Sequence, residues 1–151
     1  MARSLLPGTV VLGDFEIVRP IGRGGLVRTY LAVQKGIGRP AVIKFPRVRV
    51  LEPEFEKAVR ERFAREIATA GGIRHPNLVA VYAAGEVGGI PAVAMEYVEG
   101  MELGRWIADV GPLETKTPAD LTEQLVTVVA ALHRLGIVHR DISPESVIVT
   151  D

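Results

Sequence analysis

The feature that most constrains the fold of this chain is a change in its hydrophobic periodicity. Short segments rich in Val and Ile, bounded by turn residues, predict strands on both sides of one helical segment. The predicted strands are residues 15–21, 27–33, 41–45, 78–86 and 91–97. The helical segment is residues 53–70, where Phe55, Val59, Phe63 and Ile67 recur at helical spacing. The order of three strands, one helix and two strands predicts an α+β fold.

The second part of the chain is predominantly helical. Beyond Gly100, Pro118 and Asp120 are typical of a first helical turn, and an apolar stripe follows them as far as Gly136. The stripe consists of Leu121, Leu125, Val128, Leu132 and Leu135. Two short apolar pieces within 137–149 then enclose a charged loop, and such loops commonly carry chemistry.

Composition excludes several classes of protein. The chain has 151 residues, 48% of them hydrophobic, which is enough for one domain with a sizeable core. The absence of cysteine excludes disulfide frameworks, thiolate zinc sites and cysteine nucleophiles. No apolar run approaches the roughly 18 residues of a spanning helix. We therefore expect no membrane segment in this chain and a cytoplasmic protein, while a membrane anchor in a C-terminal continuation remains open.

Charge is balanced overall but unevenly distributed. Residues up to Val81 include 14 basic and 7 acidic side chains, whereas the remainder includes 4 basic and 11 acidic ones. A net charge of zero argues against a protein held to nucleic acid mainly by its overall charge. The basic first part suits a phosphate-binding role, and the alternative is that most of these charges are solvated surface.

Two features of the first part could bind an anion. Gly22, Gly24 and Gly25 lie between two predicted strands, where backbone N–H groups can approach a phosphate because no Cβ stands in the way. Taken alone, these glycines are better explained as a hairpin turn. Lys44 lies in an apolar strand, so its ammonium either reaches the edge of the sheet or needs an anionic partner. Glu66, on the apolar stripe of the helix, is the candidate partner.

The charged loop near the end of the chain contains His139, Arg140 and Asp141. Its carboxylate could accept a proton from a substrate hydroxyl, or it could cap a turn beside its own arginine. For an isolated tripeptide the cap is the better explanation. His75 and His133 form no cluster with metal-ligand spacing.

These signals occur in one fixed order, and together they resemble a protein kinase domain of the bacterial serine/threonine type. Residues 21–25 are similar to the start of the glycine-rich loop, and 41–44 to the strand with the nucleotide-binding lysine. Residues 95–100 are similar to the hinge between the lobes, and 139–142 to the start of the catalytic loop. The alternative, an unrelated α+β domain, requires independent motifs to fall in family order by coincidence.

The resemblance implies a protein-kinase-like small lobe, with a five-stranded antiparallel sheet and one helix. The first helices and the catalytic loop of a helical large lobe would follow. We expect an N-terminal extension over 1–14, the small lobe and hinge over 15–98, and the beginning of the large lobe over 99–151. Because the sequence ends before any Asp-Phe-Gly motif, we expect this chain alone to be catalytically incomplete.

The resemblance also assigns roles in an ATP site. The glycine-rich loop would cover the phosphates, and Lys44, oriented by Glu66, would bind the α and β phosphates. Asp141 would accept the proton of the substrate hydroxyl, and Mg²⁺ would bridge the phosphates. The full set expected to bind ATP is Ile21, Gly22, Gly24, Gly25, Thr29, Val42, Lys44, Met95, Glu96 and Val98. Within it Met95 is the gatekeeper, and the backbone of Glu96 and Val98 holds the adenine edge.

Several positions depart from the family pattern. Val27 occupies the position of the third loop glycine, and Thr29 that of the following valine. Ser143 stands where serine/threonine kinases usually carry a lysine, and Ser146 where an asparagine ligates magnesium. The intact metal site of the family is therefore not expected here.

Two functional hypotheses follow. The first is a serine/threonine kinase family member that transfers the γ-phosphate of ATP to protein hydroxyls when intact, with a protein substrate or regulatory partner. The second is a pseudokinase or kinase-like interaction module that binds a partner without phosphotransfer. Ser143 and Ser146 favour the second, whereas Lys44, Glu66 and Asp141 favour a working site.

Overall fold

The structure is a computed structural model that describes residues 5–21, 27–47, 53–70, 72–111, 118–140 and 142–150. The side chains of Glu66, of residues 68–70 and of Pro118 lie outside this description. The chain divides into two compact units. Residues 1–73 and 80–97 form the sheet unit, and residues 74–79 and 98–151 form the helical unit.

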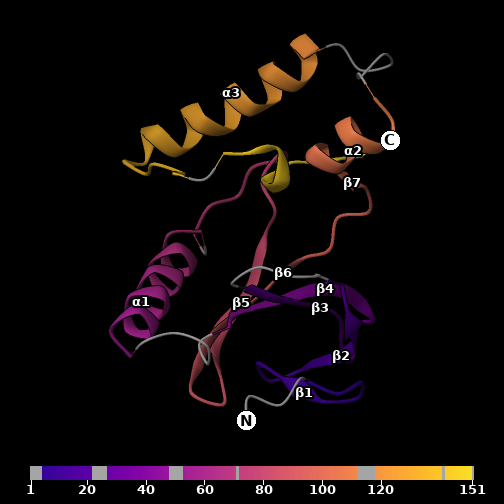
Figure 1. Cartoon of the computed structure of the whole chain (residues 1–151), viewed down its shortest axis with the longest axis vertical. Helices are drawn as coiled ribbons and strands as arrows, with labels where there is room; N and C mark the ends of the chain where they lie inside the picture. The colour runs from indigo at the N-terminus through magenta and orange to yellow at the C-terminus, as the bar shows by residue number, and fades with distance from the viewer. Residues whose placement is uncertain are drawn as a thin grey trace. The chain divides into compact units, whose positions relative to one another are not determined.

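The sheet unit is built on one antiparallel sheet with the strand order β1-β2-β3-β4-β6-β5 (Figure 1). Its strands are β1 (Val10–Val11), β2 (Phe15–Pro20), β3 (Val27–Gln34), β4 (Arg39–Pro46), β5 (Val81–Val87) and β6 (Ile90–Glu96). The α+β fold class is therefore confirmed, and each of the five predicted strands is present with shifts at its ends.

The sheet has a sixth strand that the sequence did not indicate. Val10 and Val11 of β1 pair with Glu16 and Phe15 of β2 across a tight turn in which Gly13 has a φ of 94°. A strand of two residues is too short to show alternation, so periodicity could not detect it. Part of the expected N-terminal extension is thus integrated into the sheet.

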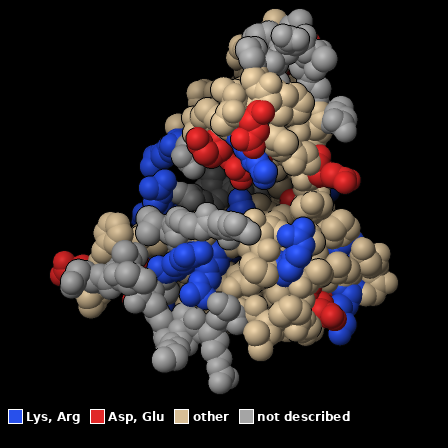
Figure 2. Space-filling model, turned by 45° about the vertical axis from the view of Figure 1, so that its right-hand side comes forward, with Lys and Arg blue, Asp and Glu red and all other residues tan. Residues whose placement is uncertain are grey.

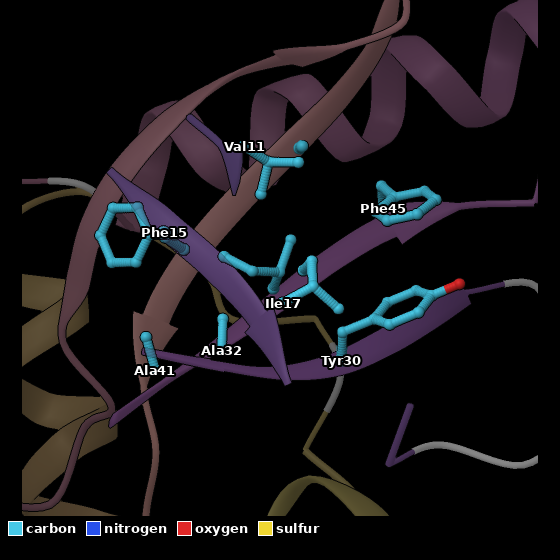
Figure 3. Packing of buried hydrophobic residues seen from close by; sticks show 10 residues of the cluster. Val11, Phe15, Ile17, Tyr30, Ala32, Ala41 and Phe45 are labelled. Atoms are coloured by element: carbon cyan, nitrogen blue, oxygen red, sulfur yellow. The ribbon is translucent and has the colours of Figure 1, made fainter. Parts of the chain in front are cut away.

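A hydrophobic core lies on one face of this sheet. Alternate residues of β2, β3 and β4 point towards one another (Figure 3), as the period of two in a strand requires. The rings of Tyr30 and Phe45 stack with centroids 5.6 Å apart. The buried cluster consists of Val11, Phe15, Ile17, Tyr30, Ala32, Ala41, Ile43, Phe45, Ala92 and Ala94.

Helix α1 (Pro53–Ala70) has the predicted bounds and packs against β4, β5 and β6. Glu54 and Glu56 in its first turn interact favourably with the helix dipole. Its predicted apolar stripe is only partly covered, because Val59, Phe63 and Ile67 are half-buried. Phe55, at the beginning of the stripe, is 51% exposed.

The helical unit contains β7 (Met101–Glu102), α2 (Leu103–Asp109), α3 (Pro118–Arg134), the 3₁₀ helix η2 (Pro144–Ser146) and β8 (Ile148–Val149). The helix predicted to end at Gly136 is confirmed as α3, and Gly136 has a φ of 73° just beyond it. Val128 and Leu132 of its predicted stripe are buried, whereas Leu135 is 61% exposed. None of the helices in the described ranges is long and apolar enough to cross a membrane.

The charge difference is smaller between the two units than between the two parts of the sequence. By sequence, the sheet unit has 13 basic and 9 acidic residues, and the helical unit has 5 basic and 9 acidic ones. The units therefore carry formal charges of +4 and −4. Both signs of charge are present on the face that Figure 2 shows.

Candidate functional site

The position of Lys44 follows from the alternation of side chains along β4. Ile43 and Phe45 point into the core and are 0% and 5% exposed. Lys44 therefore points to the opposite face of the sheet, where it is half-buried. Thr29 of β3 and Val93 of β6 lie directly opposite it on the neighbouring strands. No hydrogen bond or ion pair joins its ammonium to a side chain in the described ranges.

An apolar row lies beside Lys44 on the same face. Val42, two residues earlier, is 8% exposed and pairs with Leu31 of β3 and Met95 of β6. Residues directly opposite each other in an antiparallel pair share a face, so these three side chains adjoin. The row provides an apolar surface next to a cation.

Ile21 continues this surface. Its N–H donates to the carbonyl oxygen of Thr29 at 3.0 Å, which extends the pairing of β2 with β3 by one residue. Five of the predicted site residues thus share one face: Ile21, Thr29, Val42, Lys44 and Met95. Sequence reasoning missed Leu31 and Val93, although alternation from Thr29 and Met95 places them on that face.

Glu96, in the segment 95–100 that resembles the hinge, is fixed to the chain before β5 by two hydrogen bonds. Its N–H donates to the Ala80 carbonyl oxygen at 2.8 Å, and its Oε2 accepts from the Ala80 N–H at 3.1 Å. Because the Glu96 N–H is already bonded, a ligand at this position would have to use its carbonyl oxygen. Val98 is half-buried and belongs to the helical unit.

Several predicted site residues lie outside the described residues. They are Gly22, Gly24, Gly25, Asp141 and the side chain of Glu66. The backbone of Glu66 lies in the last two turns of α1. Its pairing with Lys44 and the catalytic role of Asp141 therefore stay predictions.

The loop around position 141 has two unusual features. Arg140 has a φ of 65°, a left-handed conformation that is uncommon outside glycine and recurs at functional sites. The Ser146 hydroxyl donates to the Ser143 carbonyl oxygen at 2.9 Å and accepts from the Ser143 N–H at 3.0 Å. Ser146 thus closes the turn of η2 from the position where the family pattern has a magnesium ligand.

The end of this loop is held by the start of the helical unit. Met101 pairs with Val149, and Glu102 with Ile148, in the β7–β8 ribbon. The Leu103 N–H donates to the Val147 carbonyl oxygen at 2.8 Å. These backbone bonds connect the residues after segment 95–100 to the residues after η2.

The residues in the described ranges do not fit a metal ion by themselves. They contain no group of three or more His, Asp or Glu side chains that could hold one. The described residues do suit a nucleotide. Lys44 offers a cation for a phosphate, and the apolar row beside it offers an apolar surface for a base.

Comparison with known proteins decides the family. The protein kinase domain family matches residues 15–151. This chain belongs to that family. Members of the family use ATP and Mg²⁺ and act on proteins, and the kinase fold follows for both units described above.

Bacterial serine/threonine kinases are similar to this kinase chain over almost its whole length. Serine/threonine-protein kinase PrkC of Bacillus subtilis is 38% identical over 146 residues, which are 96% of this chain and 22% of that protein. Serine/threonine-protein kinase pkn2 of Myxococcus xanthus is 36% identical over 149 residues, 97% of this chain and 17% of that protein. The chain thus spans about a fifth of the length of these relatives. It is a member of the serine/threonine protein kinase family.

Solved kinase structures agree with the fold. The kinase domain of PknI from Mycobacterium tuberculosis has a TM-score of 0.75 and 28% identity, over 97% of this chain and 58% of that one. The apo form of PpkA-294 has a TM-score of 0.83 over 98% of this chain and 58% of that one. At 23% identity, PpkA supports the fold alone.

Proposed function

We propose that the Lys44 face of the sheet unit binds ATP and that the protein containing this chain transfers the γ-phosphate to Ser or Thr hydroxyls of proteins. The observation that carries this proposal is the half-buried Lys44 side chain beside the apolar row of Val42, Leu31 and Met95, with no partner among the described side chains. A cation in such a place is costly unless an anion binds it.

The described residues have distinct roles in this proposal. Lys44 binds the phosphates, while Val42, Leu31 and Met95 contact the adenine ring. The Glu96 carbonyl oxygen accepts a hydrogen bond from the adenine amino group, since the Glu96 N–H is bonded to Ala80. Ile21, next to Thr29, extends the apolar surface on the same side of the base.

The remaining roles rest on the family resemblance. The backbone at Gly22, Gly24 and Gly25 covers the phosphates, and Glu66 orients Lys44. Asp141 accepts the proton of the substrate hydroxyl while the hydroxyl oxygen bonds to the γ-phosphorus. The bond between the γ-phosphorus and the β–γ bridging oxygen breaks, which yields ADP. Magnesium would neutralise charge on the phosphates in an intact family member.

The proposed domain boundaries follow the same scheme. Residues 15–98 form the small lobe and hinge, and residues 99–151 form the beginning of the large lobe. A cytoplasmic location is consistent with the use of ATP.

The test of the nucleotide site is a thermal-shift titration of the 151-residue chain with ATP, with and without magnesium. We expect the Lys44→Met variant to bind ATP at least about tenfold more weakly, because a charge-assisted bond to phosphate is lost. Lys35→Met is the matched control, since Lys35 is 56% exposed and only forms a surface ion pair with Glu16. Equal ATP affinity of wild type and Lys44→Met, or no ATP binding by wild type, would contradict the proposal.

A second candidate function is an interaction module without phosphotransfer. It is favoured by Ser146, whose hydroxyl is engaged with Ser143 where the family pattern has a magnesium ligand. A phosphotransfer assay on the full-length protein distinguishes the two functions. Turnover that Asp141→Asn abolishes supports the kinase, whereas partner binding without turnover supports the module.

A further inference from the structure

Helix α1 is held to the sheet by little apolar surface. None of its described side chains is fully buried, and Val59, Phe63 and Ile67 of its apolar stripe are each half-buried. Phe55 is exposed. A helix with such shallow packing needs additional contacts to keep one position, because most helix stability in proteins comes from burial of an apolar face.

Arg60 supplies such a contact. Its Nη1 donates to the carbonyl oxygen of Gly89, which lies in the turn between β5 and β6. Its Nε and Nη2 donate to Oε1 of Glu56, one helical turn earlier, at 3.0 and 2.8 Å. One guanidinium group thus joins the helix to the sheet and is itself held in place by the helix.

The acceptor is in a fixed position. Val87 pairs with Ile90 across a two-residue turn, and Gly88 and Gly89 have φ values of 60° and 74°. Two consecutive residues with positive φ are typical of a type I′ hairpin, whose twist matches that of the strands. The Gly89 carbonyl is therefore directed by β5 and β6, and β6 is the strand that carries Val93 and Met95.

We propose that Arg60 is a positioning residue that fixes α1, and with it Glu66, against the sheet through the Gly89 carbonyl oxygen. The expected effect of this anchor on ATP binding rests on the proposed function. Glu66 follows Arg60 by six residues, about 9 Å along the helix axis, so a shift of this segment moves the residue expected to orient Lys44.

The planar arrangement of N–H donors in the guanidinium group is needed for this role. Three of its N–H groups serve two acceptors on different elements, and a lysine ammonium cannot match that planar geometry. Arg60→Lys should therefore restore part of what Arg60→Met removes, and Glu56→Gln should weaken the same anchor while leaving the contact to Gly89 possible.

Lys57 provides a matched control on the same helix. It forms an (i, i+4) ion pair with Glu61, as Arg60 does with Glu56, but its Nζ–Oε1 distance is 4.0 Å and its side chain is 79% exposed. Lys57→Met thus removes a helical ion pair of the same spacing but leaves the contact between Arg60 and Gly89 unchanged.

Hydrogen exchange of the 151-residue chain without nucleotide tests the anchor itself. We expect Arg60→Met to accelerate exchange of the amides of residues 61–70 by about threefold to tenfold, with less change in Arg60→Lys and Glu56→Gln and none in Lys57→Met. Unchanged exchange in α1, or faster exchange throughout the sheet unit, overturns the proposal.

Titration with trinitrophenyl-ATP tests the consequence for the site. Arg60→Met should weaken binding about threefold to tenfold, Arg60→Lys less, and Lys57→Met not at all. Faster exchange in α1 with unchanged affinity overturns the positioning role. If wild type does not bind the nucleotide, the proposed function fails, and the exchange result alone decides whether Arg60 anchors α1.

Discussion

At the scale of single residues, close backbone approach is as important as side-chain chemistry. Gly100 precedes the β7–β8 ribbon, and a Cβ added there would lie against the Val149 carbonyl oxygen and 2.8 Å from Cγ2 of Ile148. The Gly100 backbone does not need a left-handed conformation, so the requirement is for space alone. Glycine at this position lets the backbone before β7 pack directly on β8.

Substitution of Gly100 should therefore destabilise the helical unit. We expect Gly100→Ala to lower the free energy of unfolding by about 1–3 kcal/mol, because the added methyl group forces the strands apart. Gly72→Ala is the control, since a Cβ at Gly72 would meet no atom within 4 Å and should change stability by less than about 0.5 kcal/mol. Urea unfolding followed by circular dichroism measures both, and equal effects would show that Gly100 is not constrained by packing.

At the scale of elements, the segment before residue 15 is part of the sheet unit. The Leu5 N–H donates to the Tyr30 hydroxyl at 3.3 Å, and the Gly8 N–H donates to the Ile17 carbonyl oxygen at 2.8 Å. Val11 is 7% exposed and belongs to the core cluster. The protein kinase domain family matches from residue 15, yet the segment before it completes the core of the lobe.

Two adjacent valines test this integration. Val11→Ala should cost about 1–3 kcal/mol of stability, since it leaves a cavity in the core. Val10→Ala should cost less than about 0.5 kcal/mol, because Val10 is 44% exposed on the other face of the same strand. Thermal unfolding of the two variants distinguishes them. Similar losses, or none, would mean that β1 is not packed on the core.

At the scale of the whole molecule, exposed apolar side chains remain on α3. Within its predicted stripe, Val128 and Leu132 are buried, at 6% and 3% exposed. Exposed apolar side chains are Val126 on the helix and Leu135 of the stripe, just after the helix, which are 59% and 61% exposed. Such residues favour non-specific association when they are contiguous with other apolar surface, and Leu125 and Val129 line a shallow hollow beside Val126.

We accordingly expect the 151-residue chain to associate at high concentration. Val126→Glu should reduce this association, because it places a charge in the apolar hollow, whereas Thr127→Glu, next to it, should not. Size-exclusion chromatography with light scattering over a range of concentrations provides the measurement. A stable monomer at every concentration would refute the expectation.

The sequence was most informative where periodicity and family motifs coincide. The helix at 53–70 was predicted with its observed bounds, and the strand that carries Lys44 was predicted with both core neighbours. It was least informative for short elements: β1, β7 and β8 have two residues each, too few for a periodic pattern. The sequence also left the burial of α3 undecided, because periodicity shows which residues share a face but not which face is covered.

The sequence by itself determined the family, the order of the longer strands with α1 and α3, and five residues of the candidate site, because local patterns and ordered motifs depend only on the chain. Tertiary structure decided which residues adjoin Lys44, adding Leu31 and Val93 through strand register. It also showed that the Glu96 N–H is bonded to Ala80 and that Arg60 joins α1 to Gly89. These contacts join residues 16 and 29 positions apart, and no local pattern encodes such pairings.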